Sequence, residues 1–403
     1  MTITNKKKSS LTLLIVVMMY MLIIICPIVD LYIPWYLTFL PVCVMLLHLC
    51  REKSQLQKAA SVMSIGLILT LFLYWFIFKR QDLFLFVING VITWIPCVIA
   101  LLCYSQINVE SQKKILQLAL IAMAVTSITT IIGLQVYPRA ARELASATED
   151  VRNFYMSLNI GGFEFIYALV LSIPVIFWMI SNTKGLIKCL NIVILLIFLY
   201  CIYLSAYTTA LLISIALLLL LIYDAYPKLR KVIIVGILLF FIMAGSGALS
   251  SIFMWLSSTV ESEYVSDRLL QIGLVLQGEA IEDLETETTN ERLLLMKNAW
   301  EGFMSSPIWG HNFASWHKEI LSGHSVGLDI LSSAGFIGLV FFISLFYKAY
   351  KKIFTSRFND LIFYTRIVWI GFIVLSIINP STFPIIYLVV FTFSSIIENY
   401  KKA

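Results

Sequence analysis

One histidine in this sequence stands where polar sequence turns apolar. His324 occupies that position, and Asp329 follows five residues later among leucines. A neutral imidazole has an ordinary pKa of about 6.5, which suits proton removal near neutral pH. We therefore treat His324 as a candidate general base and Asp329 as a candidate supporting residue. The alternative is a histidine at a membrane interface with no catalytic role.

Several arginines lie in polar segments before this histidine. A guanidinium group matches phosphate oxygens with a two-pronged hydrogen-bond pattern and keeps its charge at every relevant pH. The candidates for binding such an anion are Arg139, Arg142, Arg152, Arg268 and Arg292. The alternative for each is contact with lipid headgroups, or pairing with a nearby acid such as Glu143, Glu149 or Asp150.

The elements that would position these residues are predicted to be membrane-spanning helices. Hydrophobic residues make up 60% of the 403 residues and charged residues only 13%. Apolar runs near the 20 or so residues that cross a bilayer predict helices, because lipid leaves backbone groups no other partner. We predict twelve spans, at 11–29, 31–50, 59–78, 83–104, 115–137, 161–181, 188–206, 207–223, 231–248, 324–347, 361–378 and 382–397.

Basic residues predict the orientation of these spans. With both termini in the cytoplasm, most of the 29 Lys and Arg residues fall in inside segments, as the positive-inside rule expects. The net charge of +6 therefore indicates membrane topology and not nucleic-acid binding. The candidate arginines then face outward, in segment 138–160 and in a long loop at 249–323 within a single membrane domain, 1–403, and His324 lies at the end of that loop.

The long outer loop is expected to contain an amphipathic helix. Leu293, Met296, Trp300 and Phe303 recur at helical spacing and would form its apolar face against the membrane surface. Within the predicted spans the ionisable residues are few: Glu164, Asp329 and Arg366. Their scarcity argues against an ion-coupled transporter, which would carry such groups through its bundle, and favours a site at the outer boundary.

Neither a metal nor a cofactor is predicted. The seven cysteines fall in or beside apolar runs and are expected to be small buried hydrophobes, without disulfides. His311, His317 and His324 match no familiar metal-ligand spacing.

Two stretches resemble the bacterial O-antigen polymerase and O-antigen ligase superfamily. They are "RLLLMKNAWEGFMSSPIWGHNF" at 292–313 and "HSVGLDILSSAGFIG" at 324–338. The residues that match the family pattern in order are Arg292, Pro307, Gly310, His324, Ser325, Gly335 and Gly338. His-Ser, nine residues and Gly-x-x-Gly are close to the ligase signature. "HSVGLDIL" and "NIGGFEFIYALV" at 159–170 look more like the polymerases.

The resemblance implies a glycosyltransferase of the bacterial inner membrane, with its active site facing the periplasm. Its donor would be an oligosaccharide on undecaprenyl diphosphate, polymerised into O-antigen of lipopolysaccharide or into capsule. His324 would be the base. Arg292, with Arg139, Arg142, Arg152 or Arg268, would bind the diphosphate, while Asp329 and Glu164 would support the site. Membrane lipid, a chain-length regulator and a flippase of the same pathway are the implied partners.

The sequence departs from the family at one position and leaves two other functions open. Many members carry an arginine after Ser near the outer end of a middle span, where "LSAYTTALL" has Tyr207. One phosphate contact is then missing or supplied elsewhere. The first alternative function is a ligase that transfers the glycan to the lipid A core. The second is a flippase or other transporter of lipid-linked oligosaccharide.

Overall fold

The structure is a computed structural model, and its described residues form helices without strands. They are 11–33, 35–51, 96–97, 99–144, 148–260, 266, 269–270, 272–274, 277, 288–311, 325–353, 362–379 and 383–402. The predicted all-helical class is confirmed over this part of the chain. The predicted span 59–78 and most of 83–104 lie outside these residues.

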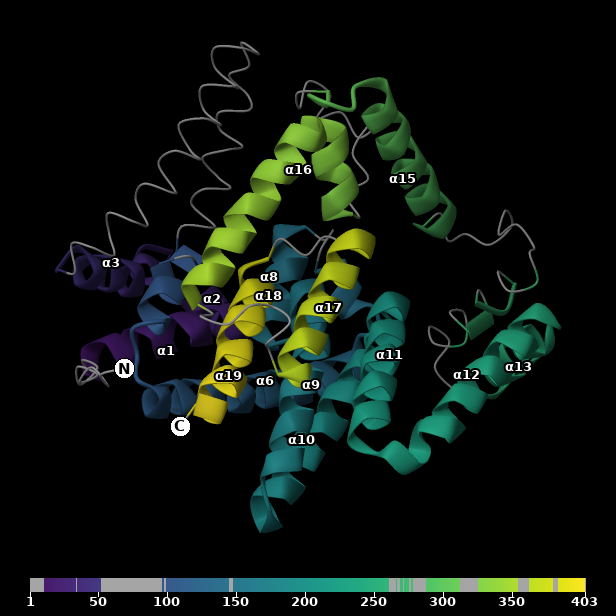
Figure 1. Cartoon of the computed structure of the whole chain (residues 1–403), viewed down its shortest axis with the longest axis horizontal. Coiled ribbons are helices and arrows are strands. Elements are labelled where there is room, and N and C mark those ends of the chain that lie inside the picture. The colour runs from purple at the N-terminus through teal and green to yellow at the C-terminus, as the bar shows by residue number, and fades with distance from the viewer. Residues whose placement is uncertain are drawn as a thin grey trace. The chain divides into compact units, whose positions relative to one another are not determined.

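The chain divides into two compact units, and Figure 1 labels the helices that belong to them. One contains Met1–Thr126 together with Leu295–Ala403, and the other contains Ser127–Leu294. The long helix α6 (Val109–Val136) supplies its first part to one unit and its last part to the other. The prediction of a single membrane domain stays a prediction.

The first predicted span ends earlier than expected. Helix α1 (Leu11–Ile25) stops at Cys26, and the short α2 (Pro27–Tyr32) begins there with proline at its first position. Proline has no N–H to donate and clashes with the preceding turn, so the backbone leaves the helix at Cys26. The next helix, α3 (Trp35–Arg51), packs against α1 in the same unit.

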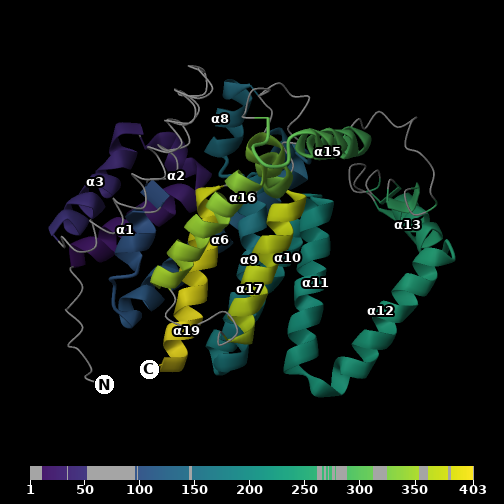
Figure 2. The same cartoon turned by 45° about the horizontal axis from the view of Figure 1, so that its top comes forward.

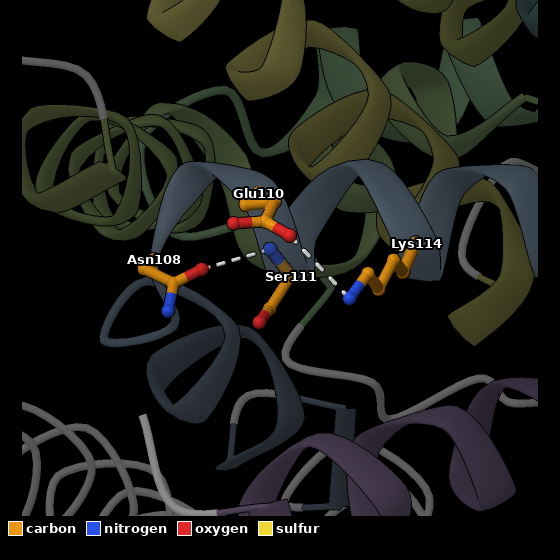
Figure 3. Close-up of polar contacts among 4 residues, drawn as sticks. All are labelled: Asn108, Glu110, Ser111 and Lys114. Carbon is orange, nitrogen blue, oxygen red and sulfur yellow. Dashed lines mark hydrogen bonds and ion pairs between the residues drawn. The ribbon is translucent and has the colours of Figure 1, made fainter. Parts of the chain in front are cut away.

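Helix α6 begins six residues before the predicted span at 115. The side chain of Asn108 accepts a hydrogen bond from the Ser111 N–H at 2.8 Å and so caps the helix (Figure 3). Glu110 and Lys114 form an exposed ion pair at 3.5 Å one turn on, which contributes little by itself. A polar first turn therefore precedes the apolar part of α6.

The carboxyl-terminal helices complete the core of the first unit. Helix α17 (Phe363–Ile378) is followed by α18 (Pro384–Leu388), a π-helical segment η4 (Val389–Phe393) and α19 (Ser394–Lys402). A π-helical turn leaves carbonyl groups available to other donors. The carbonyl of Thr392 accepts a bond from the hydroxyl of Tyr104 at 3.0 Å, which ties this segment to a helical stretch ahead of α6.

The second unit is built on α9 (Phe163–Asn182). It packs against α10 (Gly185–Leu204) and α11 (Thr208–Ala225), which lie beside it in Figure 2. Every residue from Phe165 to Trp178 is buried. A 3₁₀ turn, η2 (Pro227–Leu229), leads to α12 (Arg230–Gly245) and α13 (Ala248–Thr259). The predicted spans 188–206 and 207–223 adjoin, and in the structure only residues 205–207 separate α10 from α11.

Four described helices are long and apolar enough to cross a membrane: α6, α9, α10 and α11. Shorter apolar helices occur at Leu11–Ile25, Leu40–Arg51, Val326–Val340, Phe363–Ile378 and Pro384–Glu398. Large apolar side chains on α10, α11 and α12 are exposed, among them Leu186, Leu212 and Leu238. Water would penalise such a surface and lipid would not, so these helices suit a membrane.

Candidate functional site

Three of the predicted arginines share one segment, which we call the arginine loop, residues 138–162. It contains two short helices, α7 (Ala140–Glu143) and α8 (Glu149–Ser157), with 145–147 outside the described residues. Arg139 precedes the first turn of α7 and is exposed, Arg142 lies within α7 and is half-buried, and Arg152 on α8 is exposed. All three belong to the second unit.

The end of the arginine loop is fastened to α6. The carbonyl of Asn159 accepts a bond from the Thr129 hydroxyl at 2.8 Å, and the Gly161 N–H donates to Thr130 Oγ1 at 2.8 Å. Asn159 has a φ of 54°, a left-handed conformation that asparagine tolerates better than most residues. Ile160 is fully buried against Gly133, where a Cβ would lie 2.5 Å from Ile160 Cδ1.

Arg142 lies against an aromatic ring from α11. Its guanidinium carbon is 5.4 Å from the ring centroid of Tyr207, within the range of a cation–π interaction. The Tyr207 hydroxyl donates to the Ala141 carbonyl at 2.9 Å, one residue before the arginine. Tyr207 is only 7% exposed. Tyr207 therefore contacts the loop both by its ring and by its hydroxyl.

A second tyrosine engages the acid next to Arg142. The hydroxyl of Tyr155 on α8 donates to Glu143 Oε2 on α7 at 2.6 Å and so joins the two helices of the arginine loop. This bond, with smaller contributions from burial and from the negative charge of Glu143, raises the pKa of Tyr155 to about 12. The phenol therefore stays protonated at physiological pH.

Aromatic side chains surround this part of the loop. Tyr137 and Phe154 meet edge to face with centroids 5.5 Å apart, and both approach Tyr155 within 5.9 Å. Phe154 is 45% exposed. Exposed arginines therefore lie on the same segment as a partly exposed aromatic cluster.

The second group of predicted residues meets at a break in α16 (Val326–Ile353). Gly335 has a φ of 62° and interrupts the helix, so the residues of the predicted span 324–347 do not form one regular helix. A segment before the break and a longer one after it meet at an angle in Figure 1. Glycine alone adopts this conformation readily, which explains why the helix breaks there.

The turn after α15 (Thr288–Ser305) packs directly onto this break. The N–H of His311 donates to the Ser332 carbonyl at 2.8 Å, and the N–H of Phe336 donates to the Pro307 carbonyl at 2.9 Å. A Cβ on Gly310 would lie 2.4 Å from the Ala334 nitrogen, and one on Gly335 would lie 2.3 Å from the Ile308 oxygen. We call this contact of 306–311 with 332–337 the glycine clasp.

His311 adds a side-chain contact to the glycine clasp. Its Nε2 donates to the Gly302 carbonyl at 2.9 Å and lies 2.6 Å from the Ser305 hydroxyl. Gly302 and Ser305 are in the last turn of α15, whose carbonyl groups need donors from outside the helix. His311 thus has a defined structural role in ending α15.

The residue after His324, Ser325, immediately precedes α16. Ser325 is 1% exposed, and its hydroxyl accepts a bond from the Leu328 N–H at 3.3 Å, as an N-capping serine does. Asp329 lies in the first turn, where a carboxylate interacts favourably with the helix dipole. Glu164 and Arg366 likewise lie in the first turns of α9 and α17, away from helix centres.

The structure describes only part of the predicted site. Arg139, Arg142 and Arg152 are brought onto one loop, whereas His324 and Arg268 lie outside the described residues. Arg292 is in α15. On the expected apolar face of that helix, Trp300 is 49% exposed, and its ring lies 5.4 Å from that of Phe303. Ala299 and Phe303 are buried, and the ring of Phe303 meets that of Phe336 in α16 edge to face at 5.3 Å.

Sequence reasoning missed two contacts of the arginine loop. It noted Tyr207 only as the residue in place of an expected arginine, and it did not single out Tyr155. Glu143 and Tyr155 are twelve residues apart, and this spacing indicates no contact within a single helix or strand. The bond between them could therefore not be predicted. The departure at Tyr207 was a usable signal, because a large aromatic residue follows Ser205 and Ala206 at the start of an apolar run.

Within the described ranges, no three or more His, Cys, Asp or Glu side chains gather in a group that could hold a metal ion. The described cysteines carry free thiols. Compared with known proteins, the chain matches no family model, no curated protein and no solved structure.

Proposed function

We propose that the protein is a membrane glycosyltransferase that polymerises oligosaccharide repeat units carried on undecaprenyl diphosphate. In this proposal the chain crosses the bacterial plasma membrane twelve times and has both termini in the cytoplasm. The arginine loop and the residues 249–323 then face the exterior. The products are O-antigen or capsular polysaccharide chains.

The observation that supports this proposal best is the glycine clasp. Gly310 and Gly335 belong to the two stretches that resemble the polymerase and ligase superfamily, and they contact each other through backbone atoms. The contact joins the turn after α15 to the break in α16. It therefore brings together parts of the two stretches that resemble the superfamily.

In the proposed reaction the arginines and the histidine have different roles. The arginines bind the diphosphate of the donor and stabilise the charge that remains on it as it leaves. His324 takes the proton from the acceptor hydroxyl. The hydroxyl oxygen bonds to the anomeric carbon of the donor sugar, and the bond between that carbon and the diphosphate oxygen breaks. Attack opposite the leaving group inverts the anomeric centre. General base catalysis of this kind contributes roughly 10²–10⁴ in rate.

A strain that lacks the protein provides the test. The proposal expects single repeat units to accumulate on lipid, and long chains to return with the wild-type gene. Arg292→Lys should restore them poorly, because lysine offers a point charge and no fork. Unlinked long chains in the deletion strain would identify a ligase instead. Full chain formation by Arg292→Lys would show that Arg292 does not bind the diphosphate.

A pair of variants separates the enzyme from a transporter. The proposal expects His324→Ala to abolish chain formation while lipid-linked repeats still reach the outer face. Glu164→Ala, at the start of α9, should retain at least part of the activity. The opposite pattern, with His324→Ala active and Glu164→Ala inactive, would favour a transporter.

A further inference from the structure

We infer that one end of the second unit binds anionic phospholipid through a set of lysines, which we call the lysine end. Its members are Lys184 and Lys188 at the start of α10, and Lys228 and Lys231 at the turn between α11 and α12. The inference concerns the bilayer around the protein, and it does not depend on the proposed glycosyl transfer.

The connections between the helices place these lysines at one end. Residues 183–184 join α9 to α10, and residues 205–207 join α10 to α11. Connections this short make neighbouring helices antiparallel, so α10 begins at the end where α11 stops. Figures 1 and 2 both show the start of α10 and the turn to α12 at the lower end of these helices. The arginine loop precedes α9 and so lies at the opposite end, which puts the lysine end on the cytoplasmic side of the proposed topology.

The lysines of this end are accessible and lack acidic partners. Each is exposed, and no hydrogen bond or ion pair joins its side chain to another described residue. Asp224 is the only acidic residue in the sequence between Glu164 and Glu261. An ammonium group carries three donors and can turn them to any phosphate oxygen beside it. The lysine end therefore has an excess of positive charge that is open to an anion.

The turn that carries two of these lysines is fixed by Arg230. The carbonyl of Tyr223 would be bonded by residue 227 in a regular helix, but Pro227 has no N–H to donate. Arg230 donates to that carbonyl instead, through Nε at 2.9 Å, and its guanidinium carbon lies 5.2 Å from the centroid of the Tyr223 ring. Lys228 and Lys231 flank Arg230 and therefore extend from an ordered turn.

Apolar side chains are exposed beside the lysines. Leu186 is 86% exposed and Val232 66%, and Tyr226 and Leu229 are exposed as well. A soluble anion would bind the ammonium groups and leave these apolar groups in water. A phospholipid satisfies both kinds of group, because its phosphate meets the lysines and its acyl chains cover the apolar side chains. Tyrosine is also typical of the boundary between headgroups and acyl chains.

Lipid selection by the purified full-length protein tests this inference. The protein is placed at low salt in nanodiscs that contain phosphatidylcholine and phosphatidylglycerol, and native mass spectrometry counts the lipids of each kind that stay bound. Wild type should retain phosphatidylglycerol preferentially. Two double variants, Lys184→Gln with Lys188→Gln and Lys228→Gln with Lys231→Gln, should each lower this preference about 5- to 25-fold, because each lysine near an anionic surface contributes about 5-fold.

Two control proteins separate this surface from charge in general. Lys114 and Lys297 are exposed lysines with acidic partners, Glu110 at 3.5 Å and Glu301 at 3.8 Å. A double variant, Lys114→Gln with Lys297→Gln, should keep the preference within about 2-fold of wild type, because a carboxylate already offsets each charge. Replacement of every lysine of the lysine end by arginine keeps the charge and should also stay within about 2-fold.

Three results would overturn the inference. One is the same preference for phosphatidylglycerol in wild type and in both lysine-end variants. Another is an equal loss in the control pair, which would mean that net charge alone decides. The third is binding of poly-glutamate in detergent that depends on the lysine end, with no preference for phosphatidylglycerol in nanodiscs. That result would assign the surface to an acidic protein partner.

Discussion

At the residue scale, aromatic side chains fix the charged groups of the arginine loop. Tyr155 binds Glu143 through its hydroxyl, and Tyr207 lies under Arg142. The arginines could be predicted from the sequence as anion-binding candidates, because guanidinium chemistry follows from residue type. The tyrosines that hold them could not, since each contact joins separate helices and depends on how these pack.

Removal of the Tyr155 hydroxyl should destabilise the arginine loop without leaving a cavity, because the ring remains. Tyr155→Phe loses a hydrogen bond to a carboxylate, which contributes about 1–3 kcal/mol in typical proteins. We expect the free energy of unfolding to fall by an amount near the lower end of that range, because Glu143 is only half-buried. Thermal unfolding in detergent at pH 7 measures the change, and an unfolding temperature equal to that of wild type would contradict it.

The same bond predicts a dependence on pH at alkaline values. The folded-state pKa of Tyr155 is raised to about 12, above the ordinary value of 10.0. The stabilisation is therefore fully present below pH 10 and is lost as the pH rises through 12. The difference in unfolding free energy between wild type and Tyr155→Phe should be constant from about pH 7 to 9 and shrink above about pH 10. A difference that grew in that alkaline range would exclude the Glu143 bond as its cause.

At the element scale, two contacts between helices depend on a close approach of backbone segments. The glycine clasp joins α15 to the break in α16, and the Asn159 turn joins α8 to α6. Gly310 and Gly335 could be selected from the sequence as motif residues. The break itself was missed, because the stretch 332–338 reads equally well as a small-residue packing stripe inside one helix.

Substitution of Gly335 should destabilise the glycine clasp strongly. In Gly335→Ala the new Cβ would meet the Ile308 backbone at 2.3 Å in a conformation that disfavours alanine. We expect a loss of about 2–4 kcal/mol, from backbone strain and overpacking together. Gly327→Ala is the matched control on the same helix, where a Cβ would meet nothing within 4 Å. Equal unfolding temperatures for the two variants would refute the clasp.

The contact between Gly133 and Ile160 predicts a compensating pair. Gly133→Ala should cost about 1–3 kcal/mol, because Ile160 is fully buried and has little room to move. Ile160→Ala alone should cost about 2–4 kcal/mol through the cavity it leaves. The double variant should lose less than the sum, since the new methyl group enters the space that the isoleucine vacates. Simple additivity in thermal unfolding would argue against this packing.

At the scale of the whole molecule, the sequence predicted the helical class and the approximate bounds of α9, α10, α11 and α17. Those segments have uniform apolar composition and clear polar ends, so length and hydropathy determine them. The early stop of α1 at Cys26 and the break of α16 at Gly335 depend on single backbone conformations. A prediction based on the length of apolar runs does not detect such local features.

The central claim is that this chain transfers glycans from a lipid diphosphate without another energy source. The most direct measurement uses purified wild-type protein and lipid-linked repeat units extracted from a strain that lacks it. No nucleotide sugar or metal ion is added, and products are separated by gel and mass. The account predicts a ladder of lipid-linked chains that differ by one repeat unit. Folded protein that leaves only single repeats, or lengthens them only when nucleotide sugar is supplied, would contradict it.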